Sequence, residues 1–84
     1  MRARLRARAR LASLAMRTKL VDVAQPQFEA LLRMGYRPSR MHFGLAQIAE
    51  AKGDLTRARS EYREAVRLEP GFADARSALA RLGG

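Results

Sequence analysis

The chain is 84 residues long, enough for one small domain near the lower limit for a self-sufficient core. It contains no cysteine, which excludes disulfides and thiolate metal sites, and no apolar run of about 18 residues that would span a membrane. The formal net charge is +9 and is unevenly distributed: residues 1–21 carry seven basic residues and no acidic one, whereas residues 22–84 carry ten basic and eight acidic ones.

The basic N-terminal segment has the spacing of an amphipathic helix. Leu5, Ala9, Ala12 and Met16 recur every three or four positions and fall on one side of such a helix, while arginines cover the rest. One interpretation is a packed helix with a solvated outer face, where the arginine stems lie over apolar surface. A second is a cleavable organelle-targeting segment, because such segments are Arg-rich, amphipathic and poor in acids. A third is a contact of residues 2–19 with nucleic acid or an anionic membrane surface, although no aromatic side chain that could stack on bases occurs before residue 28.

The next segment predicts either a second helix or a continuation of the first. Residues 18–21 contain no glycine, so one long helix is an alternative to a turn at this point. Pro26 is acceptable only within the first turn of a helix, which predicts that a second helix starts near residues 23–25. Gly35 then ends this helix, with Pro38 just beyond it.

Residues 39–72 predict two amphipathic helices joined by a tight turn. The first is expected from Ser39, as N-cap after Pro38, to Lys52. The second is expected over residues 55–69, with Asp54 as its N-cap and Pro70 ending it. Small residues recur through both helices, which allows a close approach of the two axes; they are Ala46, Ala49, Ala58 and Ala65. A last short helix is expected over residues 73–82, with apolar residues that would cover one end of the domain.

An internal repeat appears when the chain is compared with itself. Leu11-Ala12-Ser13-Leu14-Ala15 parallels residues 45–49 at a shift of 34, and Leu79-Ala80-Arg81-Leu82-Gly83 follows at the same shift again. Three blocks in one register predict a degenerate helical hairpin at 5–38, a clearer one at 39–72 and a capping helix at 73–84, preceded by a basic end at 1–4.

The residues of the second unit carry a resemblance to the tetratricopeptide repeat family. The family pattern is a large aromatic, Leu-Gly, Tyr, Ala, an aromatic, Ala and Pro, with a period of about 34 residues. The corresponding residues here are His42, Leu45-Ala46, Ala49, Ala58, Tyr62, Ala65 and Pro70. The departures are His42 for the aromatic, Ala46 for Gly and Ala49 for Tyr. The resemblance implies an all-α fold, an antiparallel stack of helical hairpins (a tetratricopeptide-like α-solenoid) with about five helices.

The resemblance also implies a binding groove, because stacks of this family line a concave surface with the first helix of each pair. Carried over position by position, the groove residues are Arg6, Arg10, Ser13, Arg17, Arg40, Phe43, Gln47 and Arg81. The same faces also carry Ala9, Gly44, Glu50, Asp74 and Ser77. A basic groove with Phe43 as an exposed apolar contact would suit an extended or helical partner with acidic residues. The Lys/Asn/Arg clamp with which some relatives hold a chaperone's C-terminal carboxylate is not matched.

The expected function is therefore a protein–protein interaction adaptor or scaffold, and not an enzyme. No nucleophile–base pair, phosphate loop or acid pair at catalytic spacing occurs, so we expect no cofactor and no metal. His42, the single histidine, is expected to be a partly buried packing residue. The alternative function is binding of nucleic acid or an anionic membrane by the basic N-terminal helix. The two differ in salt dependence, which is steep for phosphate contacts.

Two hairpins and one helix are fewer than the three repeats that such stacks usually need. The apolar residues Leu5, Leu11 and Leu14 at the front end would then pair with a second chain or a larger partner, so we expect a homo-oligomer or a subunit of a larger assembly. A cytoplasmic location is expected, with an organelle-targeting N-terminus as the alternative.

Overall fold

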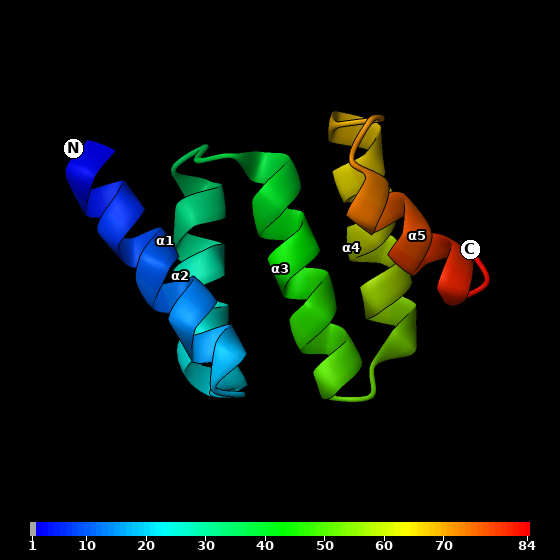
Figure 1. Cartoon of the computed structure of the whole chain (residues 1–84), viewed down its shortest axis with the longest axis horizontal. Helices are drawn as coiled ribbons and strands as arrows, with labels where there is room; N and C mark the ends of the chain where they lie inside the picture. The colour runs from blue at the N-terminus through cyan, green and yellow to red at the C-terminus, as the bar shows by residue number, and fades with distance from the viewer. Residues whose placement is uncertain (1) are drawn as a thin grey trace.

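The computed structural model describes residues 2–84, and within them the chain forms five α-helices and no strand. The helices are α1 (Arg2–Arg17), α2 (Val21–Arg33), α3 (Pro38–Ala51), α4 (Leu55–Leu68) and α5 (Ala73–Arg81). Each helix packs against the next one along the chain, and Figure 1 shows them side by side in that order with α1 at one end and α5 at the other. The prediction of an all-α stack of antiparallel hairpins is confirmed.

The chain turns between α1 and α2, so these residues do not form one long helix. Lys19 takes up the turn with a positive φ of 61°, and the backbone N–H of Leu20 donates to the carbonyl oxygen of Ala15 at 2.7 Å. The predicted start of the second helix was wrong, because α2 begins at Val21 and Pro26 lies inside it. Pro26 lacks only the N–H that would reach the carbonyl of Asp22, and Asp22 is exposed, so water can satisfy that carbonyl.

The predicted N-cap of α3 was also wrong. Arg37 is the capping residue, with a left-handed φ of 40°, and Pro38 is the first residue of the helix. Ser39 lies one residue inside α3 and is buried, and its hydroxyl donates to Oε1 of Glu69 at 2.6 Å. Serine is a preferred N-cap residue, but the hydroxyl of Ser39 instead donates to the carboxylate of Glu69, the residue that follows α4.

The turn between α3 and α4 is formed by the residues that the sequence predicted for it. Gly53 has a φ of +80°, which only glycine adopts without strain, and the side chain of Asp54 accepts a hydrogen bond from the backbone N–H of Arg57 at 3.1 Å. The prediction of Asp54 as N-cap of α4 is confirmed. α4 ends at Leu68, two residues before Pro70.

The apolar core is divided into two clusters that meet at α3. Met41, Leu45 and Ile48 face α1 and α2, where they pack with Phe28 and Leu31. The opposite face of α3 packs against α4 and α5 through small residues and two aromatics. The alanines expected to permit this close approach are all buried there: Ala46, Ala49, Ala58 and Ala65.

His42 lies at the edge of the α3–α4 contact. Its side chain is partly buried, as the sequence predicted, but it is more than a packing residue because its Nδ1 lies 2.7 Å from Oε1 of Glu61 in α4. The division of the chain into units 5–38, 39–72 and 73–84 stays a prediction, since the helices themselves do not mark where a repeat begins.

Candidate binding groove

Two hollows meet on the side of the molecule where α1 and α3 face each other. The first has a volume of about 590 Å³ and lies along α1, and the second has a volume of about 280 Å³ and extends over α3 toward Phe72. Ala9, Ser13, Tyr36 and Arg37 line both of them, so we treat the two hollows as one surface, called the α1–α3 groove below.

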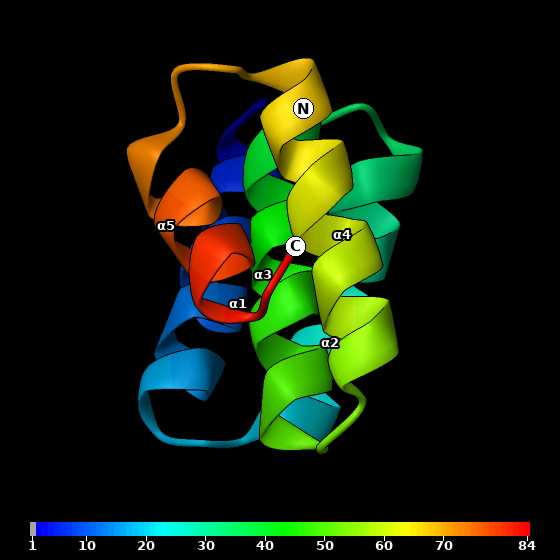
Figure 2. The same ribbon diagram turned by 90° about the vertical axis from the view of Figure 1, so that its right-hand side faces the viewer.

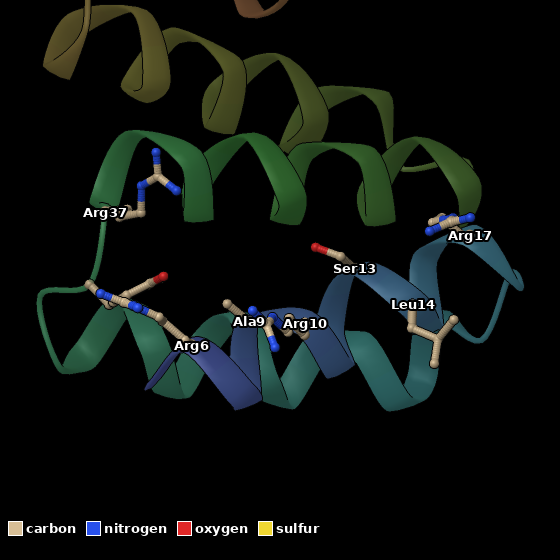
Figure 3. Close-up of a pocket in the computed structure, with 8 residues that line it drawn as sticks. Arg6, Ala9, Arg10, Ser13, Leu14, Arg17 and Arg37 are labelled. Carbon is tan, nitrogen blue, oxygen red and sulfur yellow. The ribbon is translucent and has the colours of Figure 1, made fainter. Parts of the chain in front are cut away.

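Arginines line the first hollow. Arg6, Arg10 and Arg17 come from α1, where spacings of four and seven residues place them on one side of the helix together with Ser13. Arg37 joins them from the loop before α3. Figure 3 shows Arg6 and Arg37 at one end of the hollow and Arg17 at the other, with Ser13 between them.

These four arginines are among the basic residues for which the structure gives no ion pair in its described part, as are Arg59 and Arg63 of α4. Arg40, Lys52, Arg57, Arg67 and Arg81 each form an ion pair with an acidic side chain. Within residues 2–84, no ion pair involves Arg6, Arg10, Arg17 or Arg37. Arg6, Arg10 and Arg17 therefore have no acidic side chain at ion-pair distance in the described residues, and Arg37 has only a longer-range attraction to Glu69.

Phe43 and Gln47 of α3 line the second hollow, but Phe43 is not the exposed aromatic that the sequence predicted. Its side chain is half-buried, with its ring centroid 4.9 Å from that of Phe72 and 5.5 Å from that of Tyr62. Phe43 therefore holds α3, α4 and the start of α5 together and offers only part of its ring to a ligand. Gln47 is exposed on the same face.

Arg40 lines the second hollow and is held in place by two contacts. Its guanidinium lies 3.8 Å from the centroid of the Phe72 ring, and its Nη2 donates to Oε2 of Glu69 at 2.9 Å. Hydrogen bonds from Ser39 and then from Arg40 hold the pKa of the Glu69 carboxyl below its ordinary value. These contacts orient the Arg40 side chain, but its positive charge is partly compensated by the Glu69 carboxylate.

Arg81 is not among the residues that line the groove hollows. Its guanidinium forms two hydrogen bonds with the carboxylate of Glu50, at 2.7 and 3.0 Å, and so fastens α5 to α3. The hydroxyl of Tyr62 donates to the same carboxylate at 2.5 Å. Hydrogen bonding to Arg81, followed by that to Tyr62, lowers the pKa of the Glu50 carboxyl, and burial together with the Glu50 carboxylate raises the pKa of the Tyr62 phenol.

Sequence reasoning missed Tyr36 and Arg37, which line both hollows. Gly35 and Pro38 mark this stretch as a connection, but the direction of its side chains follows from the left-handed backbone at Arg37, which the residue types do not indicate. Gly44 lines the second hollow, but it is buried and lies against the ring of Phe28, which lines the same hollow.

Neither a metal-binding cluster nor a membrane-spanning helix is found in the residues that the structure describes. No group of three or more His, Asp or Glu side chains lies close enough to hold a metal ion between residues 2 and 84. None of the helices in this part of the chain is long and apolar enough to cross a membrane.

Comparison with known protein families identifies a repeat family. A family described as Tetratricopeptide repeat matches residues 9–71, which span α2, α3 and α4 and most of α1. Neither the comparison with curated proteins nor the comparison with solved structures finds a match.

Proposed function

The chain belongs to the tetratricopeptide repeat family, whose domains serve in protein–protein interaction, and we propose that it is a non-catalytic adaptor that binds an acidic segment of a partner protein in the α1–α3 groove. The observation that carries this proposal is the set of four groove arginines, Arg6, Arg10, Arg17 and Arg37, which find no acidic partner in residues 2–84.

The groove offers two kinds of contact to such a segment. Guanidinium groups bind carboxylates with two parallel hydrogen bonds, and four of them along one hollow favour a ligand with several spaced acids. The second hollow adds the exposed amide of Gln47 and the half-buried ring of Phe43. A partner segment with acids at one end and an apolar side chain at the other therefore fits the groove best.

A pair of matched double variants tests this proposal. The probe is a fluorescein-labelled 12-residue peptide of alternating Glu and Leu, and its comparison peptide carries Gln in place of Glu. Arg10→Gln with Arg17→Gln removes two groove charges, whereas Arg59→Gln with Arg63→Gln removes two charges from α4, away from the groove.

Exposed ion pairs contribute about 0.2–1 kcal/mol each, so loss of two should weaken binding of the groove variant by roughly 2- to 30-fold in fluorescence anisotropy. The α4 variant should change the dissociation constant less than about twofold, and the Gln peptide should bind weakly to all proteins. Equal losses in both variants would show that the net charge of the chain, and not the groove, binds the peptide.

The competing function is binding of nucleic acid or an anionic membrane by α1. A 20-base-pair DNA duplex and phosphatidylserine vesicles serve as its probes in the same assay. Tighter binding of either probe than of the Glu peptide, with log affinity falling steeply against log salt concentration, would favour that function over the adaptor.

A further inference from the structure

α1 carries a second exposed surface, on the side facing away from α3. It consists of Ala7, Leu11 and Leu14, spaced four and three residues apart, and is called the outer stripe below. Leu11 is 46% exposed and Leu14 is 54% exposed, and Figure 3 shows Leu14 extending away from α3. α1 packs on α2 with a different face, through the buried Ala12 and Ala15.

The internal repeat gives the outer stripe two counterparts. At a shift of 34 residues the counterparts are Met41, Leu45 and Ile48 of α3, which are at most 6% exposed. They pack with Phe28 and Leu31 of the preceding helix, α2. At a further shift of 34 the counterparts are Ala75 and Leu79 of α5 and Leu82 just after it; Ala75 belongs to the cluster formed with α4, and the two leucines are partly buried against that cluster.

The same stripe is therefore covered by the preceding helix at two of its three occurrences. At the first occurrence no helix within residues 2–84 covers it, because α1 stands at the end of the row, as Figures 1 and 2 show. Two leucines about half exposed, at positions that the fold otherwise buries under a helix, indicate a surface shaped for a helix.

We propose that the outer stripe binds an amphipathic helix of another protein, with the apolar side of that helix on Leu11 and Leu14 and an acidic residue opposite Arg10. This surface adjoins the α1–α3 groove, because Leu14 and Arg10 also line the edge of the first hollow, whereas Ala7 and Leu11 do not line it. The bound helix would lie on α1 as α2 lies on α3.

Arg10 determines the chemistry of this partner helix. Its counterparts are Gly44 and Ala78, and a Cβ at Gly44 would already lie 2.7 Å from the Phe28 ring. A helix with an aromatic residue at the Phe28 position would therefore collide with the Arg10 side chain, whereas a carboxylate there would pair with it. Arg10 is one of six arginines in α1, which has no acidic residue, so acidic flanks on the partner match the surrounding charge.

A second copy of this chain is a poorer match. Its α2 and α4 are already covered by α3 and α5, and both carry an aromatic residue at the critical position, Phe28 in α2 and Tyr62 in α4. Pairing of two α1 helices would bring their arginines together, which costs free energy through like-charge repulsion.

The test uses the full chain and a synthetic 20-residue helical peptide, rich in Ala and Glu, with Leu at every third and fourth position. A peptide of the same composition in scrambled order keeps the charge and loses the apolar side. Leu11→Ser disrupts the outer stripe at a residue that does not line the groove hollows. Leu55→Ser is the matched control, since this leucine of α4 is 45% exposed, as against 46% for Leu11.

We expect the ordered peptide to shift the methyl resonances of Leu11 and Leu14 and to leave those of Leu55 and Leu68 unchanged. Its affinity should fall at least tenfold in the stripe variant and less than twofold in the control, and the scrambled peptide should bind at least tenfold more weakly. Equal affinity of the two peptides, or an unchanged affinity of the stripe variant, would overturn the proposal. A wild-type dimer in sedimentation equilibrium that the stripe variant abolishes would also overturn it, in favour of a second copy.

Discussion

Gly44 of α3 lies directly beneath the ring of Phe28 in α2, so that a Cβ on Gly44 would stand 2.7 Å from two ring carbons. No real Cβ contact is that short, and the ring is buried in the cluster that joins the two hairpins. The absence of a side chain at residue 44 is therefore what allows α3 to pack on α2 at this distance.

Gly44→Ala should lower the free energy of unfolding by about 1 kcal/mol, because overpacking costs about 1–3 kcal/mol and the gain in helix propensity returns about 1 kcal/mol. In a Phe28→Leu background the same substitution should become neutral or stabilising. Urea unfolding of the four proteins of this cycle measures the coupling. Equal effects of Gly44→Ala in both backgrounds would contradict the contact.

Stability should decrease in acid. The carboxyls of Glu50 and Glu69 have pKa values below their ordinary value of 4.5, because Arg81 and Ser39, respectively, donate to their ionised forms. Their contribution is thus complete above pH 4.5 and is lost as the pH falls below it, through the lower pKa values of the folded state. Urea unfolding between about pH 6 and about pH 3 should show this loss. Arg81→Gln should make the dependence shallower, whereas Arg76→Gln, an exposed change in the same helix, should not.

Tyr62→Phe should lower the free energy of unfolding by about 1 kcal/mol, since it removes the hydrogen bond to Glu50 and keeps the buried ring. It should also raise the pKa of the Glu50 carboxyl, because one of the two side chains that stabilise its charge is lost. The acid unfolding profile and NMR titration of the carboxyl report these effects. An unchanged Glu50 titration would show that Arg81 alone sets its pKa.

Phe43→Ala should lower the free energy of unfolding by about 1–3 kcal/mol, because Phe43 packs against Tyr62 and Phe72. A loss of binding in this variant would therefore combine groove contact with local unfolding. Gln47→Ala changes an exposed groove residue and should leave the melting temperature within about 2 °C. Weaker peptide binding by Gln47→Ala at unchanged stability would place the ligand on α3.

Amide hydrogen exchange should show protection along Leu5–Arg17, but less than along Leu45–Ala49. α1 packs mainly on α2, whereas α3 is buried between α2 and α4, and opening of a terminal helix costs less free energy than opening of a central one. Exchange of the α1 amides at the rate of an unfolded peptide would contradict a packed first helix. It would also favour the targeting, nucleic-acid and membrane interpretations of residues 2–19.

The arrangement of helices could be predicted from the sequence because its signals are local or periodic. Turns and helix ends are indicated by the backbone preferences of Gly53, Asp54 and Pro70. Close helix packing is indicated by the small side chains of Ala46, Ala58 and Ala65. The 34-residue recurrence of Leu11, Leu45 and Leu79 made the stacking of successive units predictable. On α1, the predicted Arg6, Arg10, Ser13 and Arg17 line one hollow.

The side-chain contacts that the sequence did not predict involve residues far apart in the chain. Ser39 donates its hydroxyl hydrogen bond to Glu69, although its residue type and position predict a helix cap. The guanidinium of Arg81 donates to Glu50, although the repeat register places Arg81 on the groove. The ring of Phe43 turns into a cluster with Tyr62 and Phe72 instead of into solvent. Residue spacing places a side chain on a face of a helix, but its charge or ring is free for a ligand only where no neighbouring helix engages it. The sequence alone therefore determined the second hairpin and the last helix, whereas the tertiary structure decided that a turn separates α1 from α2 and which groove residues remain available.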